Sequence, residues 1–309
     1  MEWEVLLIEW IQKTLGMPGN VLSNVFALIG SEEGLLLLSL ITMYCYKKEL
    51  GKKLTLLLTA VLAWSGMIKS LVARPRPYME YPDRVKALTA PTAADASVDE
   101  IAAQGYSFPS MHSATIPAGY FTLAESIGKK WAWTAAALLT VFAGFARVVA
   151  GVHYPTDVLA GWAIGFASIG IFRLAEKYVP NPLHRHLLLF VSAVPGLFFV
   201  RTHEYFTCVG ILAGALPGFY LEEKYHPYED TRNVWAMILR VAGAVIVYFV
   251  VNTVLKLPFD KAFLASDSLG ALLIRTLRYT IVVFLLMGVY PKVFPFFEKA
   301  GRKKDANRQ

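Results

Sequence analysis

The sequence predicts an all-α protein built as a bundle of membrane-spanning helices. Hydrophobic residues make up 56% of its 309 residues and charged residues only 17%, whereas an ordinary soluble domain carries charge at about a quarter of its positions. Nine apolar segments of about 14–20 residues each come close to the length that a helix needs to cross a bilayer. We therefore expect a polytopic helical bundle with about nine transmembrane helices.

The nine segments follow one another along most of the chain. They lie at roughly residues 33–46, 54–72, 111–127, 131–150, 157–175, 187–200, 205–221, 234–252 and 271–290. Residues 1–30 differ, because Glu4, Glu9 and Lys13 interrupt an apolar run. Apolar side chains still recur there at helical spacing, at Leu6, Leu7, Trp10 and Ile11. We expect residues 1–30 to form an amphipathic helix that lies in the membrane interface.

The net charge of +7 indicates membrane orientation and not a nucleic-acid partner. Basic residues do not gather in one aromatic-rich patch. They concentrate in every second loop, at Lys47, Lys48, Lys52, Lys53, Lys129, Lys130, Lys177, Arg185, Lys224 and Arg232, and in the tail 292–309. Loops rich in lysine and arginine stay in the cytoplasm. We therefore expect a cytoplasmic C-terminus, an outer N-terminus, and an outer location for the loop 73–110 and the turn 151–156.

Polar stretches break the apolar pattern on this outer face. In KSLVARPRP, residues 69–77, two prolines cannot continue a helix, so Lys69 ends a helix, Arg76 lies just past it, and both cations can turn toward one point. In YSFPSMHSA, residues 106–114, Ser110 has the position of a helix N-cap. Its hydroxyl and the free N–H groups of the first turn form an anion site.

The third polar stretch is GFARVVAGVHYPTDVLAG, residues 144–161. Gly151 and Pro155 in this stretch indicate that the helix carrying Arg147 ends and that a new helix begins near Tyr154. His153 and Asp157 are four residues apart, so they can meet on one face.

Each of these residues also has a structural interpretation when it is taken alone. A single arginine near the end of a span is more often an interfacial anchor, and a single histidine there is more often structural. An ionisable group inside a membrane helix costs about 2.5–3.5 kcal/mol on insertion scales, however, so several of them together need a common reason. Three permanent cations, two histidines, a capping serine and a carboxylate fit a phosphoryl group.

The three stretches also match a known family in motif and in order. They contain K-x6-R-P at Lys69, Arg76 and Pro77, P-S-x-H at Pro109, Ser110 and His112, and R-x5-H-x3-D at Arg147, His153 and Asp157. Over roughly residues 55–175 the chain resembles the type-2 phosphatidic acid phosphatase superfamily of integral membrane lipid phosphatases. The resemblance implies a six-helix phosphatase core, here residues 31–186, and additional transmembrane helices at 187–291.

Two positions depart from the family pattern. Met111 replaces the usual glycine of the second motif, a feature of the sphingosine-phosphate phosphatase branch, and Ala146 replaces the serine that usually precedes the arginine. That branch and the glucose-6-phosphatase branch also resemble this chain in having nine spans and an outer N-terminus. The missing serine hydroxyl removes one expected contact to phosphate and leaves the nucleophile unchanged.

The resemblance assigns a role to each motif residue. His153 is the nucleophile that takes the phosphoryl group, Asp157 orients it, and His112 protonates the departing alcohol. Phosphate is bound by Lys69, Arg76, Arg147, the Ser110 hydroxyl and the backbone N–H at Met111. We expect no metal and no other cofactor, because fixed cations can neutralise the phosphoryl oxygens. The remaining histidines do not assemble a zinc site; these are His184, His186, His203 and His226.

The predicted function is hydrolysis of a lipid phosphate monoester, such as a sphingoid-base phosphate or phosphatidic acid, through a phosphohistidine at the extracytoplasmic face. One alternative is an undecaprenyl diphosphate phosphatase, which differs in leaving group and tail. Another is a transporter that binds phosphorylated lipids without breaking a bond. The expected partners are the lipid substrate and membrane lipids, and the sequence leaves the oligomeric state open.

Two further regions have alternative interpretations. The polar loop 78–108 is either a lid over the site or a solvated connector. Four polar residues of the C-terminal helices either shape a substrate entrance or anchor the helices at the interface; these are Glu204, Asn252, Arg275 and Arg278.

Overall fold

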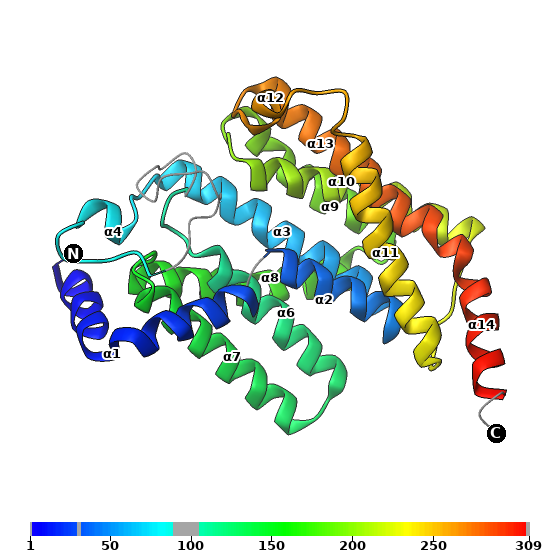
Figure 1. The fold of residues 1–309 in the computed structure, drawn as a ribbon, viewed down its shortest axis with the longest axis horizontal. Helices are drawn as coiled ribbons and strands as arrows, with labels where there is room; N and C mark the ends of the chain where they lie inside the picture. Colours follow the sequence, from blue (N-terminus) through cyan, green and yellow to red (C-terminus); the bar gives the residue numbers. More distant parts are fainter. Residues whose placement is uncertain (1, 30–31, 89–104, 307–309) are drawn as a thin grey trace. The chain divides into compact units, whose positions relative to one another are not determined.

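The computed structural model describes residues 2–29, 32–88 and 105–306, and all regular secondary structure in these ranges is helical (Figure 1). The chain divides into two compact units. Unit 1 contains Met1–Leu35 and Val61–Leu174, and unit 2 contains Leu36–Ala60 and Ala175–Gln309. The units are therefore interleaved along the sequence, because unit 2 takes its first helical segment from the region between the two parts of unit 1.

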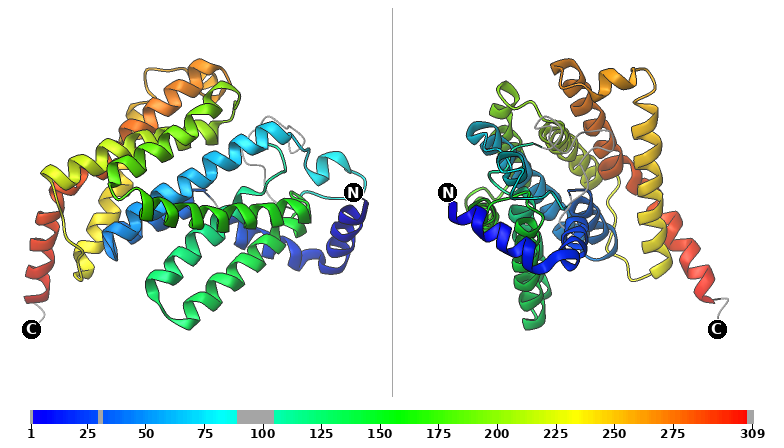
Figure 2. Two further views of the ribbon diagram at one scale, coloured as in Figure 1. Left: turned by 180° about the vertical axis from the view of Figure 1, so that it is seen from behind. Right: turned by 60° about the vertical axis from the view of Figure 1, so that its left-hand side comes forward.

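Unit 1 contains the three polar stretches. Its elements are α1 (Glu2–Ile29), the second part of α3 (Lys48–Val72), the short α4 (Pro77–Glu80), α6 (Met111–Ile127), α7 (Lys130–Val149) and most of α8 (Pro155–Tyr178). Helices α6 and α7 form an antiparallel hairpin (Figure 2). Gly128 ends α6 with a left-handed φ of 69°, and its N–H donates to the Ala124 carbonyl. The hairpin thus brings the start of α6 and the end of α7 to the same side of unit 1.

Glycines allow the helices of unit 1 to approach closely. A Cβ atom added at Gly161 of α8 would lie 2.5 Å from the Ser110 carbonyl oxygen, and the Ala114 carbonyl occupies the space beside Gly165. On α7, a Cβ atom at Gly144 would lie 2.7 Å from the ring of Trp162. Small residues at such spacing let helix backbones touch, which is how membrane helices commonly associate. This packing fixes the start of α6 against α8.

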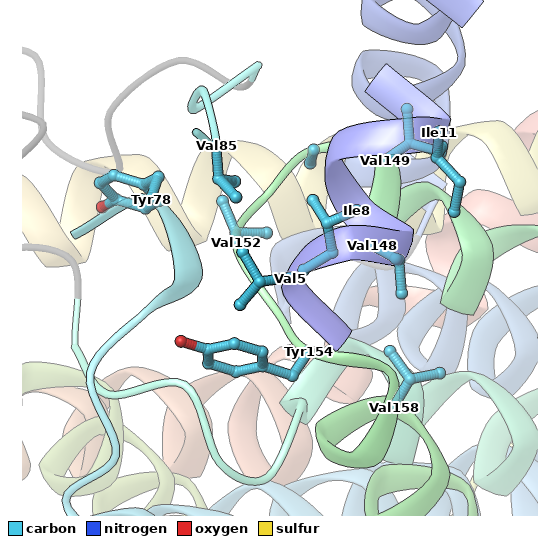
Figure 3. Close-up of a cluster of buried hydrophobic side chains, with 11 residues drawn as sticks. Val5, Ile8, Ile11, Tyr78, Val85, Val148, Val149, Val152, Tyr154 and Val158 are labelled. Carbon is cyan, nitrogen blue, oxygen red and sulfur yellow. The ribbon is translucent and has the colours of Figure 1, made fainter. Parts of the chain in front are cut away.

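Helix α1 packs against the end of α7 and the turn that follows it (Figure 3). Its buried residues Val5, Ile8 and Ile11 join a cluster with side chains from α4, the segment after it, the end of α7, the following turn and α8; these are Tyr78, Val85, Val148, Val149, Ala150, Val152, Tyr154 and Val158. Its opposite face exposes Trp3, Leu6, Leu7 and Trp10. Within the expected segment 1–30, a helix is therefore present at Glu2–Ile29, and Ile11 lies on its protein-facing side. Its position in the membrane interface stays a prediction.

Unit 2 contains the first part of α3 and most of the C-terminal helices. Its elements are α2 (Glu32–Cys45), α9 (Pro182–Ala193), η1 (Val194–Phe198), α10 (His203–Tyr225), α11 (Val234–Val254), α12 (Lys261–Ala265), α13 (Leu269–Phe284), η2 (Leu285–Val289), η3 (Tyr290–Val293) and α14 (Phe294–Ala306). Helices α10 and α13 lie side by side, and the carbonyls of Thr276 and Thr280 occupy the space beside Gly210 and Gly214.

A buried ion-pair network joins the start of α3 to the end of α10 within unit 2. The Lys52 ammonium lies 2.7 Å from Glu222 Oε2 and 2.9 Å from Glu223 Oε1, and Lys48 lies 3.1 Å from Glu222 Oε1. The side chains of Lys52 and Glu222 are only 5% and 1% exposed. Each charge in this network therefore depends on its partner, because an unpaired buried charge is very unfavourable.

Six helical segments of the described chain are long and apolar enough to cross a membrane. They are Lys48–Glu80, Lys130–Val149, Pro155–Tyr178, His203–Tyr225, Val234–Val254 and Leu269–Ala300. All nine expected segments fall on helices, but α2, α6 and α9 have only 14, 17 and 12 residues. The protein is a multi-pass membrane protein, and the expected count of nine spans is not confirmed.

Candidate active site

The turn between α7 and α8 holds His153. Helix α7 ends at Val149, and Gly151 adopts a left-handed φ of 71° at a point where the Lys86 carbonyl occupies the space of a Cβ atom. A residue with a side chain would be strained there. Helix α4 contacts this turn, because the Tyr78 N–H donates a hydrogen bond to the Gly151 carbonyl at 3.3 Å. His153 itself is 3% exposed, and Pro155 begins α8.

His153 and Asp157 face each other, as their spacing predicts. Nδ1 of His153 lies 3.7 Å from Oδ2 of Asp157, and Asp157 is fully buried. The Ser107 hydroxyl lies 3.5 Å from the same Nδ1 and donates a short hydrogen bond to Oδ2 of Asp157. Sequence reasoning missed Ser107, although it belongs to the second polar stretch, because it lies before the P-S-x-H motif in irregular backbone, where no periodicity indicates its partners.

Asp157 has further donors around both of its oxygens. The Tyr154 N–H donates to Oδ2 at 2.8 Å, and Nη1 of Arg74 donates to Oδ1 at 2.8 Å. Arg74 was also missed by sequence reasoning, which considered only the Arg76 of the first stretch. The only sequence signal for Arg74 is its place two residues before Arg76. The carboxylate is therefore fixed by a serine, a backbone amide and an arginine.

The two cations of the first stretch turn toward the same short segment. Nζ of Lys69 donates to the carbonyls of Tyr106 and Ser107. Nε of Arg76 donates to the Gly105 carbonyl at 3.0 Å, and its Nη1 reaches the Val152 carbonyl at 3.5 Å. Lys69 lies in the last turn of α3, which ends at Val72. The two cations thus connect the first stretch to the second, and Arg76 also reaches the turn that holds His153.

Arg147 and His112 complete the group. Arg147 lies in the last turn of α7 and is 5% exposed, and His112 lies in the first turn of α6. Both residues thus lie at the ends of α6 and α7 that share one side of unit 1, and their contact with the phosphoryl group stays a prediction.

Ser110 is the N-cap of α6, as its sequence position predicts. Its hydroxyl accepts from the Ser113 N–H at 3.4 Å and from the Ser113 hydroxyl at 2.9 Å. Its own N–H donates to the Asp157 carbonyl at 3.1 Å. Ser110 is fully buried, while Met111, the first residue of α6, is partly exposed. The cap therefore ties the start of α6 to the backbone of Asp157.

The surroundings of His153 favour its neutral form. Burial lowers the pKa of His153 to about 3, and the charges of Arg76 and Lys69 act in the same direction, while the Asp157 carboxylate opposes them. A neutral imidazole keeps a lone pair on one ring nitrogen. The Asp157 carboxylate faces Nδ1, so Nε2 is the nitrogen that is left for chemistry.

Other predicted features lie outside this group. Within the described ranges, no three histidine, cysteine, aspartate or glutamate side chains gather to hold a metal ion. The loop 78–108 contains residues 89–104, which are outside the described residues, so its role as a lid or connector stays a prediction. In unit 2, Arg275 contacts Thr207 at 2.8 Å and His203 at 2.9 Å, and Arg278 and Asn252 are buried.

Fold and site together define a multi-pass helical membrane protein with a buried histidine–carboxylate pair, which Arg74 contacts directly and near which Arg76 and Lys69 lie. Residues 51–179 match the model of the PAP2 superfamily, and residues 206–302 match the model described as PAP2 superfamily phosphatase, transmembrane extension. The two matches together cover more than half of the chain. The chain belongs to the PAP2 superfamily.

One curated relative gives a more specific comparison. An undecaprenyl-diphosphatase from Sulfolobus acidocaldarius is 40% identical to this chain over 60 residues. The match covers 19% of this chain and 29% of the relative, so the chain spans less than a third of that protein's length in the comparison. No solved structure matches the chain at a significant level.

Proposed function

We propose that this chain is a membrane phosphatase that hydrolyses a lipid phosphate through a phosphohistidine formed on His153. The observation that carries the proposal is the pair of His153 and Asp157, whose facing atoms are 3.7 Å apart in a buried, cation-rich environment. Binding alone does not require an imidazole that is oriented by a carboxylate, whereas a nucleophile does. The match to a phosphatase transmembrane extension supports the same chemistry.

In the first step, Nε2 of His153 attacks phosphorus, the N–P bond forms, and the bond between phosphorus and the ester oxygen breaks. Asp157 stabilises the positive charge that the ring acquires. His112 gives a proton to the departing oxygen, so a neutral alcohol leaves. Lys69, Arg76 and Arg147 offset the charge on the equatorial oxygens, which is where phosphoryl-transfer catalysis largely acts.

In the second step, a water molecule attacks phosphorus and the N–P bond breaks. His112, now neutral, accepts the proton of the water, and inorganic phosphate leaves. His153 returns to its neutral state and His112 to its protonated state. No metal is required in this scheme, because the three side-chain cations take the place of Mg²⁺. Activity is therefore expected to persist in EDTA, and loss of activity that a divalent ion restores would contradict this part.

The substrate class has two candidates. A lipid phosphate monoester fits the reaction as written, with a sphingoid-base phosphate or phosphatidic acid as examples. An undecaprenyl diphosphate is favoured by the similarity to the diphosphatase from Sulfolobus acidocaldarius. Phosphate release from a panel that contains both classes and phosphatidylglycerophosphate, measured on detergent-solubilised protein, separates them. If no member of the panel releases phosphate, a role in transport without hydrolysis replaces the proposal.

The central experiment uses the variant His112→Ala with an activated aryl phosphate. The aryl leaving group has a low pKa and needs no proton, so phosphoryl transfer to His153 proceeds, while the water that follows lacks its base. We expect a burst of phenolate close to one per active site and a protein-bound phosphate that is labile in acid and stable in alkali, as an N-phosphate is.

The control for this experiment is the double variant His112→Ala/His153→Ala. It is expected to show neither the burst nor the bound phosphate. A burst that persists without His153, or a phosphate that maps to Ser110, would show that the nucleophile has been misassigned.

A further inference from the structure

A glutamate of the N-terminal helix contacts Arg74 and Thr156, which both adjoin Asp157. Glu4 lies in the first turn of α1 and is fully buried. Its Oε1 accepts from the Thr156 N–H at 3.1 Å and from the Thr156 hydroxyl at 2.7 Å, and its Oε2 accepts from Nη2 of Arg74 at 2.9 Å. A carboxylate in such a place is stable only when it is paired and hydrogen-bonded, and Glu4 is both.

Arg74 joins this glutamate to Asp157. Its Nη2 faces Glu4, while its Nη1 donates to Oδ1 of Asp157 at 2.8 Å and to the Thr156 hydroxyl at 2.9 Å. The guanidinium carbon lies 3.6 Å from the centre of the Tyr154 ring, and the Tyr154 hydroxyl donates to Glu80 at 2.6 Å. Stacking and bidentate hydrogen bonding leave the guanidinium little freedom, which is a property that lysine does not share.

The two carboxylate oxygens of Asp157 have different partners. Oδ1 is taken by Arg74, and Oδ2 receives Ser107 and the Tyr154 N–H and faces His153. Rotation of the carboxylate would break the Arg74 contact. The charge of Glu4 also matters, because Arg74 would otherwise place an unbalanced positive charge beside Asp157 and weaken its effect on His153.

We propose that Glu4 and Arg74 are positioning residues that hold Asp157 against His153, so that the N-terminal helix is part of the active site. The inference rests on the proposed phosphohistidine chemistry and adds to it two residues to which the three motifs assign no role. The contacts of α1 around the same turn support it. Nε2 of Gln12 donates to the carbonyls of Lys86 and Val149, and its Oε1 accepts from the Lys86 N–H.

The experiment measures the burst of phenolate in the His112→Ala background, with Glu4→Gln or Arg74→Lys added. Glutamine keeps the shape of Glu4 and can still accept from Thr156, but it lacks the charge. Lysine keeps the charge of Arg74 but cannot hold two carboxylates in a fixed geometry. The burst amplitude counts competent sites and the burst rate is expressed per competent site, so a partly misfolded preparation does not distort the rate.

The matched control is Glu9→Gln in the same background. Glu9 also lies on α1 and pairs with an arginine of the adjoining segment, Arg84, at 3.1 Å, but neither residue contacts Asp157. Breaking this pair tests whether weaker docking of α1 is by itself sufficient to slow the chemistry.

We expect Glu4→Gln and Arg74→Lys to slow the burst about tenfold, with unchanged substrate concentration for half-maximal rate, and Glu9→Gln to keep the parent rate. Burst rates within twofold of one another in all variants would overturn the inference. An equal slowing of the burst by Glu9→Gln would also overturn it, because the effect would then come from weaker docking of α1. The same holds if Arg74→Lys changes only the substrate concentration for half-maximal rate, because Arg74 would then contact the substrate. Absence of any burst in His112→Ala itself would instead refute the proposed function.

Discussion

At the scale of single residues, the Ser107 hydroxyl lies beside both a buried imidazole and a buried carboxylate. It donates to Oδ2 of Asp157, the same oxygen that faces His153, and Ser107 is fully buried. The hydroxyl therefore competes with the imidazole for this oxygen and at the same time fixes its direction. Because Oδ2 faces His153, fixing the direction of this oxygen also restricts the orientation of the imidazole.

Replacing Ser107 with alanine tests this role. A hydrogen bond to a charged group contributes about 1.5–3 kcal/mol, and the remaining donors to Asp157 retain part of this. We expect kcat for a soluble aryl phosphate to fall about tenfold, with little change in KM. The control is Ser168→Ala, because Ser168 is also buried but its hydroxyl only bonds the Ile164 carbonyl of its own helix. Equal activity of the two variants would contradict a role for Ser107.

The depressed pKa of His153 predicts a pH dependence of stability. The folded-state pKa is about 3, below the ordinary value of about 6.5, so between these pH values the unfolded chain binds more protons. The free energy of unfolding therefore decreases as the pH falls through this window, by about 2 kcal/mol at pH 5 for this one residue.

His153→Asn, which carries no titrating group, should lose correspondingly less stability than the parent between pH 7 and pH 5. Thermal unfolding of both proteins in detergent at the two pH values measures this difference. A parallel decline would mean that His153 titrates normally in the folded protein.

Residue-level prediction from sequence succeeded where a helix fixes the geometry. The cap at Ser110 follows from the preference of serine for the N-cap. His153 and Asp157 do lie 3.7 Å apart, although only Asp157 is on α8 and His153 lies in the turn before it. The sequence did not predict that Arg74, and not Arg76, is the arginine that contacts Asp157. Both lie in irregular backbone after Ala73, which has a φ of 49°, and no periodicity sets the direction of a side chain there.

At the scale of elements, the contact between α6 and α8 depends on the absence of a side chain at Gly161. The atom that a Cβ would meet is the carbonyl oxygen of Ser110, which belongs to the cap of α6. A larger residue must therefore push the start of α6 away from α8, and Ser110 and Asp157 move with the two helices.

Gly161→Ala is expected to destabilise the protein by about 1–3 kcal/mol, as overpacking usually does, and to reduce kcat. Gly170→Ala is the matched control, because the space beside Gly170 on the same helix is empty within 4 Å. There, the better helix propensity of alanine makes the variant neutral or up to about 1 kcal/mol more stable. Thermal unfolding and turnover of both variants measure the difference. A tolerated Gly161→Ala would refute the close approach of the helices.

The element boundaries show what apolar composition can and cannot predict. The long helices α7, α8, α10 and α11 agree closely with the expected spans, and α10 continues through Pro217. The expected span at 187–200 instead breaks into α9 and a 3-10 turn after Ala193. Pro195 lacks an N–H and Gly196 favours irregular backbone, and a count of apolar residues does not register either effect.

At the scale of the whole molecule, the proposed site is expected on the extracytoplasmic side of the membrane and the C-terminus in the cytoplasm. Helix α7 has 20 residues and at about 1.5 Å per residue spans about 30 Å, the thickness of a hydrocarbon core. Lys130 lies at one end of it. The other end is joined to the segment after α4, because the Leu88 N–H donates to the Ala150 carbonyl at 3.0 Å.

Single cysteines at the exposed positions Asp83 and Lys130 test this orientation, in a background in which Cys45 and Cys208 are replaced. An impermeant thiol reagent added to intact cells is expected to label the Asp83→Cys variant and to label Lys130→Cys only after the membrane is opened. The reverse pattern would place the site in the cytoplasm, and labelling of both in intact cells would contradict the topology.

The ion pairs at the start of α3 affect which fragments of the protein can fold, because they join this helix to α10. A fragment that stops at residue 186 contains the entire match to the superfamily, residues 51–179, but it lacks Glu222 and Glu223. The fragment would thus leave Lys52 without the two carboxylates of α10, and it would expose the apolar surface that residues 36–60 bury within unit 2. Expression of that fragment should give a protein that aggregates or is degraded, whereas the same fragment supplied with residues 187–309 as a second chain can recover its partners. The minimal folding unit is thus larger than the stretch that defines the family.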